Sequence, residues 1–205
     1  MLLAIRPACA DELAFAHTNA PAASAAAQQR NGSEPHESWL VPSLHALGLM
    51  IVMRGTETYL WPEPFARTSR FAYHYEQAFT RPPLFDTSRP LFEADGDRWH
   101  INVIGHGLFG SELYLRARTC NKPLWQALLF TGAASTLWEY GFEANGVRPS
   151  GLDLVFTPAA GIVLGEARLQ LWRFAGTLES GAGRSVLRGV MDPLGELERW
   201  AGAPC

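Results

Sequence analysis

The sequence predicts an all-α protein, a small helical bundle with an irregular connector that is rich in proline and aromatic residues. Strand-like alternation is scarce, whereas small and polar residues recur three or four positions apart in the second half of the chain, as on one face of a helix. A chain of 205 residues, 47% of them hydrophobic, can form one substantial core. Charged residues make up only 18%, which favours much buried or membrane-facing surface. The predicted segments are a signal remnant and flexible linker (1–38), a helix with the irregular connector (39–98), a helical module (99–175), and a loop with a short C-terminal helix (176–205).

The first segment is rich in alanine, asparagine, glutamine and serine and has no periodic apolar face. Ala8-Cys9-Ala10 has the small-x-small pattern of a signal-peptide cleavage site. The apolar run before it is short for a signal peptide and contains Arg6. Two interpretations stay open: a signal that begins upstream of Met1, or an accidental resemblance.

The second segment begins with the uncharged stretch Trp39–Met53, in which Pro42 fits a first helical turn. A membrane-spanning helix needs about 20 apolar residues, so we predict a buried or interfacial helix here rather than a span. Another short helix is predicted at Arg70–Phe79. Arg81-Pro82-Pro83 ends it, because the residue before a proline avoids the α region. Residues 82–97 are the irregular connector.

The module contains three predicted helices, which cover Ile101–Arg118, Pro123–Phe142 and Ser150–Phe174. Asn121 is expected to cap the second of them. A proline inside a helix costs about 3 kcal/mol, so we expect a break or kink at Pro158. Beyond the module, Gly176–Arg184 is predicted as a glycine-rich loop, and Asp192-Pro193 opens a short amphipathic helix that ends near Trp200.

Polar residues on the small-residue faces of the module are the candidate functional groups. His106 shares a helical face with Gly110 and Tyr114, and the glycine lets another backbone approach closely. His106 is either a hydrogen-bonded core histidine, or a general base or metal ligand. Glu139, with Glu143 one turn later, follows a long uncharged run. Its carboxylate lies either at a water boundary or buried with a partner such as His106 or an arginine.

Ser150 and Asp153 form a capping-box pattern, in which the Asp153 carboxylate reaches back to the backbone amide of Ser150. A chemical role for Asp153 must compete with this structural role. Farther along the same predicted helix, Thr157, Gly161 and Gly165 recur every four residues. Such a stripe of small residues permits close helix packing, as in membrane bundles, and it also occurs in soluble cores.

Several function classes are disfavoured. A net charge of −3 and the lack of a lysine-rich tail give no electrostatic reason to expect nucleic acid. The nucleotide-binding GxxxxGK[ST], zinc HExxH and hydrolase GxSxG motifs are missing from the sequence, and no cofactor is expected. The three cysteines, Cys9, Cys120 and Cys205, lack metal-ligand spacing, and one stays unpaired unless Cys9 is removed. Cys120 has no obvious activating histidine, which disfavours a thiol enzyme.

An ordered set of motifs from Trp99 to Glu166 resembles a known family. The motifs are WHINVIGHGLFGSELYLRAR with Asn102 and His106, the block STLWEY at 135–140, the later Glu143, and RPSGLDLVFTPAAGIVLGE. They resemble an uncharacterised bacterial envelope family, a domain of unknown function that is often followed by a β-rich C-terminal part. A looser similarity exists to VanZ-like membrane proteins, and it implies proximity to a bilayer rather than an activity. The residues that fill the VanZ-like pattern are Glu139 or Glu143, Arg148, Ser150, Asp153, Gly161 and Gly165.

Two functions fit these observations. The first is a non-catalytic protein of the bacterial envelope, periplasmic or membrane-associated, that organises a membrane surface or an envelope partner protein. The second is a hydrolase or transferase acting on lipid or cell-wall material, with His106 as base and Glu139 and Asp153 as its orienter or as metal ligands. The residues expected to bind a ligand are Glu143, Arg148 and Ser150, and Glu166 is expected to face inward with the rest of the set. The sequence leaves the substrate and the metal open.

Overall fold

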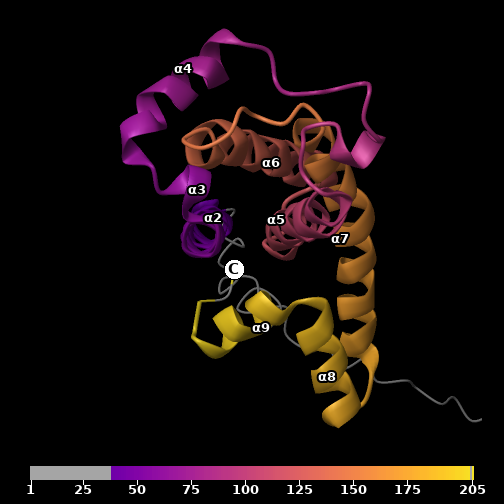
Figure 1. The fold of residues 1–205 in the computed structure, drawn as a ribbon. Coiled ribbons are helices and arrows are strands. Elements are labelled where there is room, and N and C mark those ends of the chain that lie inside the picture. Colours follow the sequence, from indigo (N-terminus) through magenta and orange to yellow (C-terminus); the bar gives the residue numbers. More distant parts are fainter. Residues whose placement is uncertain (1–37, 204) are drawn as a thin grey trace, which may run out of the picture. The chain divides into compact units, whose positions relative to one another are not determined.

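The regular elements of this computed structural model, which describes residues 38–203 and 205, are all helices (Figure 1). The all-α prediction is therefore confirmed. The signal remnant and linker, predicted at 1–38, lie almost wholly outside the described residues. The elements are α2 (Leu40–Leu60), α3 (Pro62–Phe65), η1 (Thr68–Arg70), α4 (Phe71–Thr80), η2 (Leu91–Glu93), η3 (Ile101–His106), α5 (Gly107–Thr119), α6 (Leu124–Leu137), η4 (Trp138–Glu143), α7 (Asp153–Thr177), α8 (Ala182–Met191) and α9 (Pro193–Trp200).

Small residues allow α5 and α7 to pack backbone against backbone. A Cβ atom on Gly161 would lie 2.8 Å from the carbonyl oxygen of Gly110, and one on Gly110 would overlap the backbone of Thr157. A Cβ atom on Gly165 would lie 2.7 Å from the ring of Tyr114. The predicted use of this stripe for close helix packing is confirmed, and any larger residue there would push the two helices apart.

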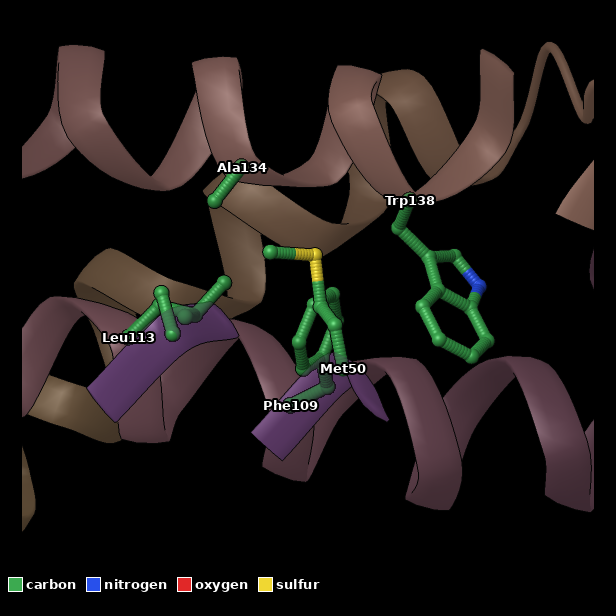
Figure 2. Close-up of a cluster of buried hydrophobic side chains, with 6 residues drawn as sticks. Met50, Phe109, Leu113, Ala134 and Trp138 are labelled. Carbon is green, nitrogen blue, oxygen red and sulfur yellow. The ribbon is translucent and has the colours of Figure 1, made fainter. Parts of the chain in front are cut away.

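A buried apolar cluster joins α2 to α5 and α6. Figure 2 shows Met50 of α2 beside Phe109 and Leu113 of α5, with Ala134 and Trp138 across from them. Met50 and Leu113 are almost completely buried, and the ring centroids of Phe109 and Trp138 are 5.8 Å apart. Burying a side chain of this size contributes about 1.5–3 kcal/mol. The predicted first helix is therefore real, and it is seven residues longer at its C-terminal end than the apolar stretch that predicted it.

Asn121 ends α5 instead of capping α6. Its φ is 61°, in the left-handed region that asparagine tolerates. Its N–H bonds the carbonyl of Arg118 at 3.1 Å, and the N–H of Lys122 bonds the carbonyl of Ala117 at 3.0 Å. These two bonds are the Schellman pattern of a helix C-terminus. The expected cap is wrong because α6 begins only at Leu124, too far along the chain for an N-cap at Asn121.

Pro158 lies inside an unbroken helix. α7 runs from Asp153 to Thr177 without interruption, so the expected break does not occur, whereas a kink at Pro158 stays a prediction. The proline removes only the hydrogen bond to the carbonyl of Leu154. The close packing of Gly161 against α5 offsets this loss, because the two backbones meet there only if α7 continues past Pro158.

The C-terminal segment contains one helix more than predicted. The expected loop at Gly176–Arg184 is only partly a loop, since α7 ends at Thr177 and α8 begins at Ala182. The expected short helix is confirmed as α9, and the carboxylate of Asp192 caps it by accepting the N–H of Gly195 at 3.0 Å. α8 is strongly amphipathic but short, and its glycines hid it in the sequence.

Ion pairs hold α9 against α2, α5 and α8. Arg116 and Asp192 are fully buried, and their Nη2 and Oδ1 atoms are 3.3 Å apart. Arg116 Nε also lies 3.2 Å from Oε2 of Glu198, whose Oε1 is 2.5 Å from Nδ1 of His45. We call this set the paired network, and its members are His45, Glu112, Arg116, Arg168, Arg188, Asp192, Glu196, Glu198 and Arg199.

A disulfide adds a covalent link at the same end of the described chain. Cys120, at the end of α5, is joined to Cys205, 85 residues later. Closing so long a loop reduces the entropy of the unfolded chain, which stabilises the fold by about 2–4 kcal/mol.

Much of the surface of the bundle is apolar. α7 is long and apolar enough to cross a membrane, a property that it shares with core helices of soluble proteins. Only 22% of its most apolar window is buried against the rest of the described structure. Large apolar side chains are exposed on α2, α6 and α7. They include Leu44, Leu47, Ile51, Trp125, Leu129, Leu137, Val155, Val163 and Phe174. Many large apolar side chains exposed on one bundle favour contact with a membrane or a partner.

Candidate functional site

The three residues predicted as a catalytic set lie together, although they come from three different elements. His106 is the last residue of η3, Glu139 lies in η4, and Asp153 is the first residue of α7. All three are buried, and each offers one nitrogen or oxygen atom within 4.8 Å of the others. Nε2 of His106 is 3.6 Å from Oδ2 of Asp153. The fold thus brings together one imidazole and two carboxylates that are far apart in sequence.

Two of these residues lie in π-helical turns. η3 and η4 are π-helices at the ends of α5 and α6, and η4 contains Glu143 as well as Glu139. π-turns are rare and occur mostly at functional sites, because each extra residue redirects the side chains around it. The α-helical spacing used in the sequence analysis therefore holds only approximately for His106 and Glu139.

Ser150 organises the carboxylates around it. Its hydroxyl accepts the N–H of Asp153 at 3.0 Å and donates to Asp95 at 2.7 Å. Its own N–H donates to Oε2 of Glu139 at 2.7 Å. The predicted capping box is thus half right: Ser150 caps α7, but Glu139 takes the backbone amide that Asp153 was expected to bind. The carboxylate of Asp153 instead faces Nε2 of His106 and interacts with the side chain of Asp95.

His106 is held in a neutral form by its surroundings. Burial lowers the pKa of His106 to about 4. Its Nδ1 is 3.2 Å from the hydroxyl of Thr157. In the tautomer that donates this hydrogen bond, Nε2 has a lone pair that faces Oδ2 of Asp153, so the two atoms need a proton or a cation between them. A cation between them would satisfy both, and a histidine that ligates a metal commonly donates its other ring N–H in this way.

The carboxylates repel one another. Burial raises the pKa of Glu139 to about 8, against the hydrogen bond from Ser150, and the charge of Asp95 adds to the rise. Burial, followed by the charge of Glu139, raises the pKa of Asp153 to about 9. Burial acts in the same direction on Asp95, but hydrogen bonds from Ser150 and Asn102 outweigh it and lower the pKa of that group. The site therefore favours added positive charge, as a proton or as a metal ion.

In the candidate set, one buried oxygen of each carboxylate has no hydrogen-bond partner in the described part of the chain, namely Oε1 of Glu139 and Oδ1 of Asp153. Both side chains line a pocket of about 430 Å³, within the range of small-molecule sites. We call it the polar pocket. Buried polar atoms are almost always paired, so a pair of orphaned oxygens beside an open pocket indicates a ligand.

The three residues predicted to bind a ligand, Glu143, Arg148 and Ser150, all line the polar pocket. Burial and the charge of Glu139 raise the pKa of Glu143 well above its usual value. The remaining lining residues are Tyr73, His74, Gln77, Arg81, Leu84, Asp95, Asp97, Gly146 and Val147. Contact with a ligand remains a prediction for each of them.

Sequence reasoning missed Asp95 and gave Asn102 no role. Nδ2 of Asn102 donates to Oδ1 of Asp95 at 2.9 Å and to the carbonyl of Phe92 at 3.0 Å. Asp95 lies in a turn that Gly96 makes possible with a φ of 105°. An Asp-Gly-Asp turn just before a helix is the sequence signal for it, and the irregular connector around it obscured that signal.

Glu166 does not belong to the site. It accepts hydrogen bonds from Tyr114 at 3.0 Å and from Arg118 at 3.2 Å. Because α7 extends to Thr177, Glu166 lies mid-helix and has partners, contrary to the expectation that it faces inward with the candidate set.

Gly105, Gly107 and Gly110 have the spacing of a dinucleotide-binding fingerprint. They lie within η3 and α5, with no strand before them among the described residues, so no phosphate-binding loop forms there.

Comparison with known proteins gives a family but no function. A family model described as a domain of unknown function, DUF3943, matches residues 91–194, about half of the chain. No curated protein and no solved structure matches the chain. The match includes η3 to α8 and every residue of the candidate set. The chain therefore belongs to the DUF3943 family.

Proposed function

We propose that this protein is a divalent-metal-dependent hydrolase or transferase of the bacterial envelope that acts on lipid or cell-wall material. One observation supports it above all: His106, Glu139 and Asp153 converge beside an open pocket, with one oxygen of each carboxylate unpaired. A set that served packing alone would be expected to be dry and fully paired.

The distances suit a small transition-metal ion. Ligand atoms around a tetrahedral zinc ion stand roughly 3.4 Å from one another. Nε2 of His106 and Oδ2 of Asp153 are already 3.6 Å apart. The widest separation in the set, 4.8 Å, would shrink on binding through movement of a side chain such as Glu139. Three protein ligands and an open position are typical of catalytic zinc sites, and manganese and iron accept the same donors.

The residues around the set define the chemistry. A bound ion would polarise a carbonyl or phosphoryl oxygen and activate a water molecule. Glu143, whose pKa burial and the charge of Glu139 raise well above its ordinary value, is suited to donate a proton to a leaving group. Ser150 keeps Glu139 and Asp153 in register through its three hydrogen bonds. In this proposal His106 is a metal ligand rather than the base, since burial lowers its pKa too far for it to take a proton at neutral pH.

Two features support the envelope location. Disulfides persist in oxidising compartments such as the bacterial periplasm, and Cys120 is paired with Cys205. The exposed apolar side chains of α2, α6 and α7 suit contact with lipid.

The exposed apolar surface also favours a second candidate function, a non-catalytic protein that organises a membrane surface or an envelope partner. The backbone packing of α5 against α7 resembles that of membrane helix pairs. Extraction without detergent tests the membrane contact that both candidates include. Quantitative recovery of the chain as a soluble monomer would contradict it.

Metal binding separates the two functions. Zn²⁺ and Mn²⁺ are titrated into the metal-free full-length protein by calorimetry, and the metal content of the purified protein is measured. His106→Ala and Asp153→Asn are each expected to weaken binding more than about 10-fold, since even the loss of an outer partner of a metal ligand costs 10–100-fold. Glu179→Gln removes an exposed carboxylate outside the pocket and is the matched control. Unchanged affinity in folded His106→Ala would leave the organising function as the better proposal.

A further inference from the structure

The polar pocket contains basic groups that the metal site does not use. His74 and Arg81 come from α4 and its C-terminal end, and Arg148 comes from the loop between η4 and α7. All three line the same pocket as Glu139 and Asp153. The pocket therefore has a buried acidic side and, on other elements, a basic side.

Arg148 has a buried N–H group, at Nε, without a hydrogen-bond acceptor in the described chain. No carboxylate of the described residues forms an ion pair with it, although five acidic side chains line the same pocket. In the paired network, by contrast, Arg116 and Arg168 each face a carboxylate within 3.3 Å. A buried guanidinium N–H that opens onto a pocket needs an acceptor from a ligand.

The chemistry of the two sides selects the ligand. A guanidinium binds phosphate and carboxylate oxygens through parallel, charge-assisted hydrogen bonds. A phosphate group has enough oxygens to contact a metal ion on one side and several basic side chains on the other, whereas a carboxylate has only two. We propose that Arg148, with Arg81 and His74, binds the phosphate group of the substrate, so that the protein acts on a phosphate ester. This inference rests on the proposed metal-dependent function for its reaction, but the binding of the phosphate group is testable by itself.

The acidic side of the pocket predicts how binding depends on metal. Without a cation, this side of the pocket offers a phosphate group no positive charge, and the carboxylate of Asp95, whose pKa hydrogen bonds lower, repels an anion. Phosphate binding should therefore be weak in the metal-free protein and stronger once Mn²⁺ is bound. A site that held phosphate through arginine alone, on an exposed surface, would show no such dependence.

Calorimetry on the full-length protein tests the assignment, with phenyl phosphate as the phosphate ester and phenylacetate as the matched carboxylate. Arg148→Met should weaken phenyl phosphate binding about 10- to 100-fold, the effect of one lost charge-assisted contact. Arg148→Lys, which keeps the charge without the fork, should lose less and guards against a folding defect. Arg173→Gln removes an exposed arginine of α7 outside the pocket and should bind like the wild type.

The outcomes separate this inference from the proposed function. Mn²⁺ binding is measured first, in the absence of phosphate. If Mn²⁺ binds but phenyl phosphate binds no better than phenylacetate, or Arg148→Met binds as the wild type does, the phosphate assignment is wrong and the metal site stands. If Mn²⁺ does not bind but phenyl phosphate binding depends on Arg148, the metal proposal fails and the phosphate assignment stands.

Vesicles identify the source of the phosphate group. Phosphatidylcholine vesicles are compared with vesicles that also contain phosphatidic acid. Binding to the second kind that depends on Arg148, without binding of the soluble ester, supports a lipid headgroup. Binding of the soluble ester at equal strength supports a phosphate ester that needs no lipid. Binding to vesicles that is unchanged in Arg148→Met, together with no binding of the ester, overturns the assignment.

Discussion

The bundle contains two groups of buried charges, and they are built on opposite plans. In the paired network, arginines and carboxylates alternate, and each buried charge has an opposite charge within ion-pair distance. At the polar pocket, the carboxyl groups of Glu139 and Asp153 lie close to each other and to the neutral imidazole of His106. The orphaned atoms of the paired network, such as Nε of Arg116 and Oε2 of Glu198, face each other, whereas those of Glu139 and Asp153 line an open pocket.

This difference separates a structural cluster from a functional one. A balanced network stabilises the fold because each charge neutralises its neighbour. A crowd of like charges destabilises the fold, and such strain persists in proteins mainly where it serves binding or catalysis. Removing a charge should therefore have opposite effects on stability in the two places.

The largest effect is expected from Arg116→Met. The change leaves Asp192 fully buried with a weaker set of partners and leaves Glu198 facing an apolar side chain. Breaking a buried ion pair from one side typically costs about 3–5 kcal/mol. The free energy of unfolding in urea measures the loss. A loss below about 1 kcal/mol would show that the network behaves like a set of surface ion pairs. The proposed difference in stability between the paired network and the polar pocket would then be wrong.

Cys205→Ser should have the next largest effect at the same end of the described structure. It opens a loop of 85 residues and should lower the free energy of unfolding by about 2–4 kcal/mol. Urea unfolding of the wild type and of the variant, both without reductant, measures the difference. Thiol titration of the denatured wild type checks the pairing directly, because Cys120 and Cys205 should react only after reduction.

Glu139→Gln should change stability in the opposite direction. The amide keeps an oxygen for the N–H of Ser150 and removes a charge that burial and neighbouring carboxylates disfavour. The metal-free protein should gain about 1–3 kcal/mol at neutral pH, since each unit of pKa shift corresponds to about 1.4 kcal/mol. Thermal unfolding with and without Mn²⁺ measures it, and the wild type alone should be stabilised strongly by the ion. A variant less stable than the metal-free wild type would mean that Glu139 has a structural role.

The fold was more predictable than the site, for a physical reason. The stripe at Thr157, Gly161 and Gly165 fixes which side of α7 meets α5, because only small residues let two backbones touch. The helix start at Asp192 follows from local chemistry alone. Such features depend on residues close in sequence, and a reader of the sequence can find them. The predictions of a cap at Asn121 and of a break at Pro158 failed because local sequence allows two outcomes at each position. Asn121 can end one helix or cap the next, and Pro158 can break a helix or lie inside it. Tertiary packing decides between these outcomes.

The site depends on residues far apart in sequence, so its partners could only be proposed. Spacing placed His106 and Glu139 on small-residue faces, and the fold does bring them together. Nothing in the sequence indicates that Glu139, rather than Asp153, accepts the backbone N–H of Ser150. It also could not show that π-turns redirect the side chains of η3 and η4. Asp95 was missed because nothing local links an irregular turn to a helix that begins 58 residues later.

The smallest expected effect lies at the rim of the paired network and depends on pH. Hydrogen bonds from Trp172, Arg188 and Arg199 outweigh the effect of burial and lower the pKa of Glu196 from 4.5 to about 2. A carboxylate with a lowered pKa stabilises the folded state above its unfolded pKa, and this contribution is lost as the pH falls from about 4.5 toward 2. Glu196→Gln should therefore reduce the loss of stability on acidification while costing under about 1 kcal/mol at neutral pH, because the group is largely exposed. Urea unfolding at a series of pH values measures both quantities. Parallel pH profiles for the variant and the wild type would show that the rim contributes nothing to the network, and that its stability comes from the buried pairs around Arg116 alone.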